Sequence, residues 1–368
     1  MNSTYRLHLV GGFLGSGKTT AIIAASKTLI QRGLKIGVVT NDQGKYLVDT
    51  AFFRLSDLPT VEVSGGCFCC NYGDLEEQIH TLEQQVKPDV IFAESVGSCA
   101  DLVATVVKPL LQLRQTAYTP ASFSVFTDAR LLWLRLLDEP LPFSDNVLYI
   151  FDQQIEEADL LVVNKTDLLP TQAQQEVIQL AKQRYPNKEV IGQNSLAPGG
   201  VNTWLDRIEN RFSLHSIASL SIDYQRYGTG EAQLAWLDQT LTLSVPSSHA
   251  RIAIIEAIEN ILSTLRERKA AIGHIKFLIS DSSNAGIKLS FTTLETPDWI
   301  ERLPSLQSGE TRLTINARVE MDAVTLQRVV HTCFERAVKK HGGSLCIEQS
   351  EAFHPRFPQP TYRMSNSS

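Results

Sequence analysis

Three observations predict an α/β fold in which a doubly wound, mainly parallel sheet is followed by a smaller ferredoxin-like α+β domain. Short apolar runs alternate with amphipathic helical patterns through the first half of the 368-residue chain. A glycine-rich turn joins the first apolar run to the first helical pattern. In the second half, a strand–helix–strand order occurs twice. Alternating strands and helices favour a parallel sheet covered on both faces, and the repeated strand–helix–strand order is typical of a ferredoxin-like domain.

The first domain is expected over residues 1–212. Its strand-like segments are residues 5–10, 35–40, 60–63, 90–93, 122–127, 160–163 and 189–191. The clearest amphipathic helices between them are residues 19–32, 75–86, 128–137 and 172–184. The apolar runs are nearly continuous, as in strands that are buried on both faces.

A linker is expected over residues 213–239, where Ser, Gly, Tyr and Thr occur with little periodicity. The C-terminal α+β domain is expected over residues 240–352, with one strand more than the ferredoxin-like pattern. Its predicted strands are residues 240–245, 274–279, 288–293, 312–319 and 344–347, and its predicted helices are residues 250–271 and 322–340. The tail, residues 353–368, is expected to be irregular because its prolines are too frequent for a helix.

The composition is that of a globular protein, with 43% hydrophobic and 20% charged residues, and the length favours two domains over one. The net charge of -6 lacks the basic excess typical of proteins that bind nucleic acids or anionic membranes. No apolar run approaches the roughly 18 residues of a membrane span, and the N-terminus has no signal-peptide pattern. We therefore expect a cytoplasmic protein that binds neither nucleic acid nor membrane.

The glycine-rich turn has the spacing of a phosphate-binding loop. It matches G-x-x-x-x-G-K-[ST] between a strand and a helix, which is the context that this motif requires. Glycines let successive N–H groups point at phosphate oxygens, and the helix adds the positive end of its dipole. Lys18 is expected to bind the β- and γ-phosphates and Thr19 to coordinate Mg²⁺. The predicted nucleotide-binding residues of the turn are Gly12, Gly15, Ser16, Gly17, Lys18, Thr19 and Thr20. The alternative is a strand–helix turn without a ligand.

The tetrapeptide Asn164-Lys165-Thr166-Asp167 follows a buried strand and indicates guanine. The Asp167 carboxylate can accept two hydrogen bonds from guanine, whereas adenine would leave it unpaired at a cost in free energy. We expect Asn164 to tie this segment to the phosphate loop and the stem of Lys165 to cover the base. The backbone of Ser195 is expected to support the guanine carbonyl. The alternative is an ordinary surface turn.

A third motif, Glu94-Ser95-Val96-Gly97, ends another apolar strand. Glu94 occupies the position of a Walker-B carboxylate, which holds the Mg²⁺ ion or its water. Gly97 is expected to donate its N–H to the γ-phosphate. The alternative is a carboxylate that merely ends a strand.

Cys67, Cys69 and Cys70 lie within four positions. Thiolates favour Zn²⁺ or Cu(I), and two or three of them with a carboxylate or water form a metal-transfer site. The alternative is a group of small buried residues beside the nucleotide pocket. The other cysteines are unassigned, two of them expected in the core, and the histidines are scattered singly. These cysteines are Cys99, Cys333 and Cys346.

The order of the four motifs resembles the CobW-type metal-centre GTPases, which are relatives of UreG and HypB, over about residues 5–210. This resemblance implies a GTPase that couples GTP binding and hydrolysis to delivery of a divalent metal, Zn²⁺ or Co²⁺, to a client metalloprotein or a cofactor-assembly protein. It implies catalytic roles for Lys18 and Glu94. The segment N-E-x-G of the family corresponds to residues 41–44, so Asp42 becomes a candidate for catalysis and for contact with the transported metal or an Mg²⁺-bound water. Lys45 stands where the family often has a second acid.

Two other functions stay open. An ATP-using P-loop enzyme, such as a small-molecule kinase, requires the guanine motif to be accidental, and a GTP-switched scaffold requires no metal transfer. No residue stands out as a water-positioning Gln or an arginine finger, so slow intrinsic hydrolysis is expected. A nucleotide-dependent homodimer fits this class of protein.

Overall fold

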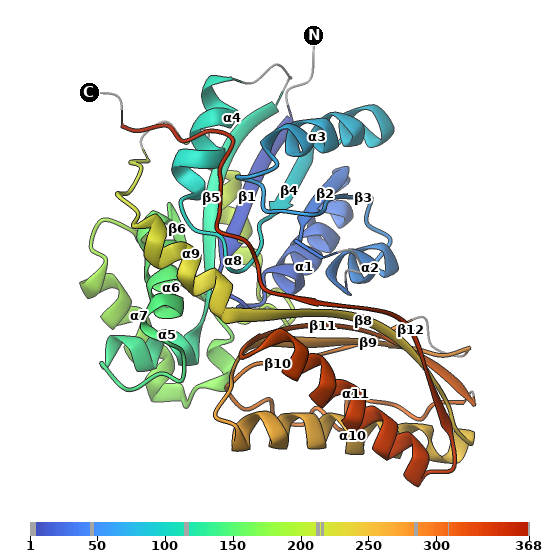
Figure 1. The fold of residues 1–368 in the computed structure, drawn as a ribbon. Helices are drawn as coiled ribbons and strands as arrows, with labels where there is room; N and C mark the ends of the chain where they lie inside the picture. Colours follow the sequence, from blue (N-terminus) through green and yellow to red (C-terminus); the bar gives the residue numbers. More distant parts are fainter. Residues whose placement is uncertain are drawn as a thin grey trace.

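The computed structural model describes residues 5–44, 48–113, 118–210, 214, 217–282, 286–307 and 309–366. Lys45 lies outside these ranges. The α/β domain and the C-terminal domain lie against each other, and the last segment of the chain returns across the α/β domain (Figure 1). Within the described ranges, no helix is both long enough and apolar enough to cross a membrane.

A parallel sheet of seven strands, counted within the described residues, forms the centre of the first domain. The strand order is β3-β2-β4-β1-β5-β6-β7, and every pairing is parallel. The strands are β1 (Tyr5–Gly12), β2 (Ile36–Asn41), β3 (Thr60–Val63), β4 (Val90–Glu94), β5 (Tyr118–Asp128), β6 (Leu160–Asn164) and β7 (Glu189–Gln193). All the predicted strands are therefore present, several of them longer than predicted.

Helices cover both faces of this sheet, as the prediction of a doubly wound fold requires. Alternate strand residues divide between two cores: Val39 and Ile91 face the α3, α6 and α7 side, whereas Val38 and Phe92 face the α1, α2 and α8 side. The elements are α1 (Lys18–Gln31), α2 (Val48–Leu55), α3 (Tyr72–Val86), η1 (Val103–Val107), α4 (Lys108–Gln112), α5 (Ala129–Leu136), α6 (Asp145–Glu157), η2 (Thr166–Leu168), α7 (Thr171–Arg184) and α8 (Asn202–Glu209).

The C-terminal domain is an antiparallel sheet with two helices on one face. Its strand order is β10-β9-β11-β8-β12, which is the predicted ferredoxin-like arrangement with β10 as the added edge strand. Apolar residues on α10 and α11 pack on alternate residues of the strands to form its core. The elements are β8 (Leu234–Ser244), α10 (Ser247–Glu267), β9 (Ala271–Ser280), β10 (Ile287–Phe291), β11 (Glu310–Glu320), α11 (Ala323–Lys340) and β12 (Ser344–Phe353).

The predicted linker is wrong over its second half, where α9 (Tyr224–Gln233) and the start of β8 lie. The side chain of Asp223 caps this helix by accepting hydrogen bonds from the N–H groups of Gln225 and Arg226. Two glycines give α9 a low helix propensity, but Tyr227 and Gly230 are buried. Tertiary packing therefore stabilises a helix that the local sequence does not predict. The predicted helix 250–271 is also displaced towards the C-terminus: α10 begins at Ser247 and ends at Glu267, because the chain turns at Arg268 and β9 begins at Ala271.

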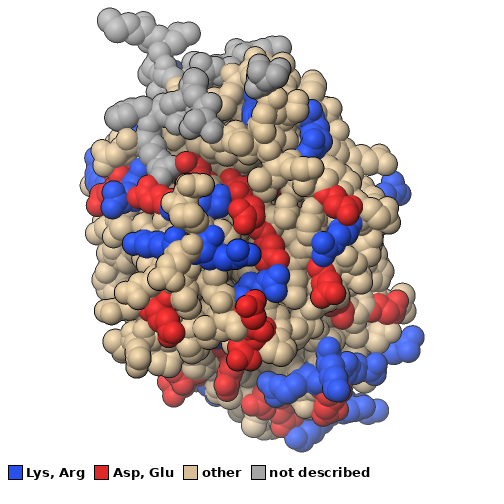
Figure 2. All heavy atoms as spheres, turned by 90° about the vertical axis from the view of Figure 1, so that its left-hand side faces the viewer, with Lys and Arg blue, Asp and Glu red and all other residues tan. Residues whose placement is uncertain are grey.

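On the face drawn in Figure 2, acidic and basic side chains are interspersed among the coloured residues. This mixture agrees with the small net charge of -6. The face therefore offers no broad area of a single charge sign among the residues that are drawn in colour.

We expect Gly230→Ala to destabilise the fold by about 1–3 kcal/mol, the usual cost of overpacking. A Cβ atom at this position would lie 2.5 Å from the carbonyl oxygen of Asn146 in α6. Thermal unfolding followed by circular dichroism measures the effect. The matched control is Gly73→Ala in α3, where a Cβ atom meets nothing within 4 Å and should stabilise by about 0.5 kcal/mol. Equal stability of the two variants would contradict the close packing of α9 on α6.

Candidate nucleotide and metal sites

The phosphate loop between β1 and α1 depends on glycine for its shape. Gly12 has φ +124°, and a Cβ atom there would lie 2.0 Å from the carbonyl oxygen of Phe126 in β5. Gly17 has φ +90°, and a Cβ atom there would lie 2.5 Å from Asn164 Nδ2. Both the left-handed backbone and the close neighbours exclude a side chain. The loop thus has a tight shape that requires glycine at these two positions, as the motif predicts.

Lys18 and Thr19 begin α1 and point into this region. Lys18 Nζ donates hydrogen bonds to the carbonyl oxygens of Gly12 (2.7 Å) and Phe13 (3.3 Å). Burial lowers the pKa of Lys18 to about 8, although the nearby Glu94 opposes this shift. A buried ammonium group held by two carbonyls is suited to an anionic ligand, which would supply the missing negative charge.

Glu94 at the end of β4 faces Thr19. Thr19 Oγ1 donates to Glu94 Oε1 at 2.9 Å, while Glu94 Oε2 is buried without a hydrogen-bond partner among the described residues. Burial, followed by the charge of Asp49, raises the pKa of Glu94. A hydroxyl and a carboxylate with an unpartnered oxygen fit a hard divalent cation such as Mg²⁺, which prefers oxygen ligands.

The segment after β6 is tied to the phosphate loop, as predicted for Asn164. Asn164 Nδ2 donates to the carbonyl oxygen of Ser16 (2.8 Å). Its Oδ1 accepts hydrogen bonds from the Oγ (2.8 Å) and N–H (3.3 Å) of Ser195. The backbone N–H of Ser195 is therefore directed at Asn164 in this structure. Lys165 Nζ donates to Asp128 Oδ2 at 3.0 Å, which holds the lysine stem over this end of the cavity.

These elements surround a cavity of about 460 Å³. Every predicted nucleotide-binding residue except Gly12 lines it. From the first domain come Gly15, Ser16, Gly17, Lys18, Thr19, Thr20, Asp42, Glu94, Gly97, Asn164, Lys165, Asp167 and Ser195. The structure thus brings five separate stretches of the chain to one cavity at the carboxyl ends of the parallel strands, where ligands of such sheets bind.

The second domain forms part of the same cavity, which the sequence analysis did not anticipate. Trp236, His274, Lys276, Lys288 and Arg318 all line it. They come from four strands, and they share the sheet face that α10 and α11 leave uncovered. The sequence did carry a signal, since polar residues alternate with apolar ones in β9 and β11. Such alternation usually indicates a solvent-facing surface, so it did not reveal a shared site.

Arg318 is a buried guanidinium that joins the two domains. It donates from Nη2 to Asp42 Oδ1 (2.9 Å) and from Nη1 to Asp238 Oδ1 (2.9 Å). Its Cζ lies 3.6 Å from the centre of the Trp236 ring. Burial alone would lower the pKa of Arg318, but Asp238 and Asp42 outweigh it and raise the pKa. Asp42, the candidate metal contact, thus lies in the nucleotide cavity and pairs with the second domain.

A second cross-domain ion pair lies beside it. Asp49 in α2 contacts Lys276 in β9 through Oδ2 and Lys288 in β10 through Oδ1, the latter at 2.7 Å. Burial alone would raise the pKa of Asp49, but the two lysines outweigh it and hold the pKa well below its usual value. The single carboxylate of Asp49 is therefore the ion-pair partner of two ammonium groups.

The three clustered cysteines meet within one turn that follows β3. The Sγ atom of Cys67 lies 2.7 Å from that of Cys69 and 3.3 Å from that of Cys70, and Cys69 and Cys70 are 3.8 Å apart. Hydrogen bonding with the thiols of Cys69 and Cys70 lowers the pKa of Cys67. Three thiol ligands within reach of one ion fit Zn²⁺, which prefers sulfur and nitrogen ligands. Among the described residues, these three cysteines are the side chains at this position whose ligand atoms lie close enough together to hold one metal ion. Asp42 does not belong to this group.

Two further residues adjoin the cluster. Cys99 is fully buried, and burial, followed by its interaction with Cys67, raises the pKa of its thiol well above the usual value. Glu231 in α9 is also buried, with Oε1 accepting from Ser98 Oγ (2.8 Å) and Oε2 unpartnered among the described residues. Burial, followed by the charge of Cys67, raises the pKa of Glu231 well above its usual value. A carboxylate therefore does accompany the thiols, but it comes from α9, the helix inside the predicted linker.

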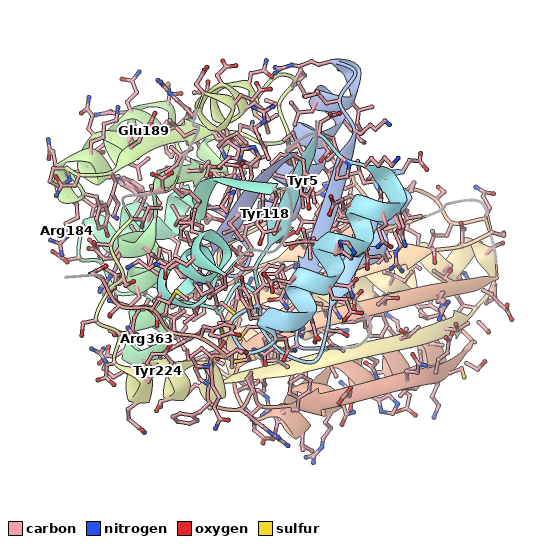
Figure 3. The ribbon with its side chains drawn as sticks, turned by 90° about the horizontal axis from the view of Figure 1, so that it is seen from above. Tyr5, Tyr118, Arg184, Glu189, Tyr224 and Arg363 are labelled. Carbon is pink, nitrogen blue, oxygen red and sulfur yellow. The ribbon has the colours of Figure 1, made fainter. Side chains whose placement is uncertain are left out.

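The C-terminal segment covers the cysteine turn. Thr361 N–H donates to the carbonyl oxygen of Cys69 (2.8 Å), and Gln359 N–H donates to Cys70 Sγ (3.3 Å). Arg363 lies beside Tyr224 (Figure 3) and donates from Nε to Asp101 Oδ2 at 2.7 Å. The irregular tail that the prolines predict is therefore held in place by side-chain and backbone contacts.

One short segment contacts both sites. Asn41 at the end of β2 donates from Nδ2 to the carbonyl oxygen of Gly66 (2.8 Å), and its Oδ1 accepts from the N–H of Phe68 (2.8 Å). These bonds hold the start of the cysteine turn. The next residue, Asp42, binds Arg318 in the nucleotide cavity. The two candidate sites are thus joined through adjacent residues.

Comparison with known families agrees with this geometry. A family model described as the CobW/HypB/UreG nucleotide-binding domain matches residues 6–192, half of the chain. The chain belongs to the CobW/HypB/UreG family. The resemblance to CobW-type proteins that the sequence indicates is therefore confirmed.

Curated relatives match up to about half of the chain. The zinc chaperone YeiR of Escherichia coli is 32% identical over 195 residues, which are 50% of this chain and 54% of YeiR. The zinc chaperone CobW of Sinorhizobium sp is 28% identical over 183 residues, which are 44% of this chain and 51% of that protein. The chain thus spans about half the length of these relatives. Among solved structures, Zn(II)-bound YjiA GTPase from E. coli is 12% identical with a TM-score of 0.39, covering 90% of this chain and 99% of YjiA.

We expect Arg318→Met to destabilise the protein by about 3–5 kcal/mol at pH 8, because Asp238 would remain buried without its cation. The cost should be smaller at pH 5. Burial already raises the pKa of Asp238 to about 6 in spite of Arg318, and without Arg318 the pKa rises further. A buried carboxyl group whose pKa is raised in the folded state favours folding at low pH, where it is protonated, and this stability is lost as the pH rises through that pKa. The variant loses more of this stability than the wild type, because its Asp238 has no cation beside it.

Urea unfolding at the two pH values measures this difference. The matched control is Arg312→Met on the same strand, since the Arg312 side chain is 59% exposed and its surface ion pair contributes little. A cost for Arg318→Met that is the same at pH 5 and pH 8 would contradict the buried pairing with Asp238.

Proposed function

We propose that this chain is a GTP-binding and GTP-hydrolysing metallochaperone that couples its nucleotide state to the binding and delivery of a divalent metal. The observation that carries this proposal is the contact of adjacent residues, Asn41 and Asp42, with the cysteine turn and with the nucleotide cavity. A change at the γ-phosphate that moves this segment would reach the cysteines directly. Such ordering and release of a segment is a common nucleotide switch.

Guanine nucleotide is the proposed ligand of the cavity. The phosphate loop and Lys18 would hold the phosphates, with Gly97 donating to the γ-phosphate. Asp167 lines the cavity beside Asn164 and Lys165, which supports recognition of the guanine N1–H and 2-amino group. Ser195, which hydrogen-bonds Asn164, would keep this loop in position.

Thr19 and Glu94 would hold Mg²⁺, which neutralises charge on the β- and γ-phosphates during hydrolysis. Their hydrogen bond and the unpartnered Glu94 Oε2 support this role. Asp42 lines the same cavity, so we assign it to a Mg²⁺-bound water in preference to the transported metal. Intrinsic hydrolysis is expected to be slow, and the proposed catalytic residues are Lys18, Glu94 and Asp42.

Zn²⁺ is the proposed cargo, with Co²⁺ as the alternative metal, and Cys67, Cys69 and Cys70 are its proposed ligands. The names of the curated relatives YeiR and CobW, both zinc chaperones, support zinc. Glu231 and Cys99 adjoin the thiols and offer further donors. An incomplete, adaptable ligand set favours transfer over permanent binding. The recipient would be a client metalloprotein or a cofactor-assembly protein, and a nucleotide-dependent homodimer remains a prediction.

Exchange of Asp167 for Asn tests the guanine assignment. A carboxylate accepts from the two donors of guanine, whereas an amide presents one acceptor and one donor, which match the N1–H and C2 carbonyl of xanthine. We therefore expect Asp167→Asn to lower GTP affinity at least about tenfold and to raise XTP affinity. Competition with a fluorescent nucleotide measures both. The control is Asp206→Asn, an exposed residue on α8, and ATP binding as tight as GTP binding in the wild type would refute the assignment.

The coupling of the two sites predicts that a non-hydrolysable GTP analogue tightens Zn²⁺ binding relative to GDP, by about tenfold if the coupling is of ordinary size. Competition with a chelating dye measures the Zn²⁺ affinity in each nucleotide state. Cys69→Ser should weaken Zn²⁺ binding in both states, because an alcohol is a poor zinc ligand.

The matched control for that experiment is Cys346→Ser, since Cys346 is exposed and lies in β12 away from the cluster. Equal Zn²⁺ affinity with GDP and with the analogue would exclude the coupling. An unchanged affinity in Cys69→Ser would exclude the cysteine site.

A further inference from the structure

The second domain brings positive charge into the nucleotide cavity. Lys276 in β9 and Lys288 in β10 both line it, and both side chains are largely buried. Arg318 lies on the same face, but Asp42 and Asp238 neutralise it with two carboxylates. By contrast, the two lysines share the single carboxylate of Asp49. The group formed by Lys276, Lys288 and Asp49 thus carries one positive charge in excess.

The two lysines lie at the phosphate end of the cavity. Lys276 and Lys288 line the same cavity as Lys18 and Glu94. A Cβ atom on Gly15 would lie 3.0 Å from the carbonyl oxygen of Gly273, which precedes Lys276 in β9. Lys18 and Glu94 define the end where the β- and γ-phosphates and Mg²⁺ would lie. Direct packing agrees, because a Cβ atom on Gly15 of the phosphate loop would lie 2.4 Å from Thr292 Cγ2 of the second domain.

His274 provides an independent sign of a missing ligand. It lines the cavity and is 5% exposed, and neither ring nitrogen has a hydrogen-bond partner among the described residues. Burial, followed by the charges of Lys276 and Arg318, lowers the pKa of His274 well below its usual value. A neutral imidazole still has one N–H donor, and leaving it buried and unpaired costs free energy. A phosphate oxygen would accept from it.

We propose that Lys276 and Lys288 bind the γ-phosphate of GTP, with His274 donating a further hydrogen bond, so that the second domain distinguishes GTP from GDP. This inference rests on the proposed GTP-binding function. An ammonium group has three N–H donors, so each lysine can contact Asp49 and a phosphate oxygen together. Asp49 follows the segment that contacts the cysteine turn. The γ-phosphate would thus act, through the two lysines and Asp49, both on the second domain and on the chain that follows Asn41 and Asp42.

Equilibrium binding of GDP and of a non-hydrolysable GTP analogue tests the proposal in the full-length protein with Mg²⁺. Lys276→Met and Lys288→Met should each weaken analogue binding by about 10–100-fold, the size of a lost charge-assisted hydrogen bond, and should weaken GDP binding less than about threefold. The matched control is Arg312→Met, an exposed cation on the same sheet, for which both affinities should stay as in the wild type. Circular dichroism confirms folding of each variant.

Asp49→Asn separates phosphate binding from a merely structural ion pair. It keeps both lysines and removes a negative charge near the phosphate, so analogue binding should be retained or become tighter. If the ion pair only held the domains together, Asp49→Asn would lose analogue binding as the lysine variants do, and the proposal would be overturned. This comparison also holds if one lysine variant fails to fold.

Two further outcomes are decisive. Wild-type protein that binds both nucleotides, with lysine variants that lose both equally or lose neither, would overturn this inference and leave the proposed function intact. Wild-type protein that binds neither nucleotide would overturn both.

Discussion

A guanidinium group is stable inside a protein only when carboxylates neutralise it, and Arg318 draws its carboxylates from two domains. Asp238 comes from its own sheet and Asp42 from the end of β2. The Trp236 ring covers the remaining face of the group. This contact holds the second sheet over the phosphate loop, and residues of both domains line the nucleotide cavity. The ion pair of Asp49 with two lysines reinforces the same placement.

The segment at the end of β2 connects the cysteine turn to the contact between the two domains. Asn41 holds the cysteine turn through hydrogen bonds to backbone groups on both sides of Cys67, and Asp42 holds Arg318. Backbone hydrogen bonds are directional, so a displacement of this segment cannot leave the turn unaffected. The arrangement therefore supplies a short physical path between the cavity and the cysteine turn, without any long chain of intermediates.

A buried carboxyl group lies near the cysteines, and the ionised form of such a group becomes more stable beside a cation. Glu231 is buried near Cys67, and its pKa is raised well above its usual value by burial and by that charge. Arg363 of the C-terminal segment lies at the edge of this region, paired with Asp101. A divalent ion at the thiols would supply positive charge where this buried acid lacks it.

The sequence by itself determined the parallel sheet, the phosphate loop, the Asn164–Asp167 segment and the cysteine turn, because each depends on local periodicity or on closely spaced residues. Only the tertiary structure decided that β8, β9, β10 and β11 complete the nucleotide cavity. Residues such as His274 and Lys288 lie far from the phosphate loop in the chain, and their alternation in a strand is equally typical of a solvent-facing surface. Helix α9 and its Glu231 were hidden for a related reason, since long-range packing outweighs the low helix propensity of its glycines.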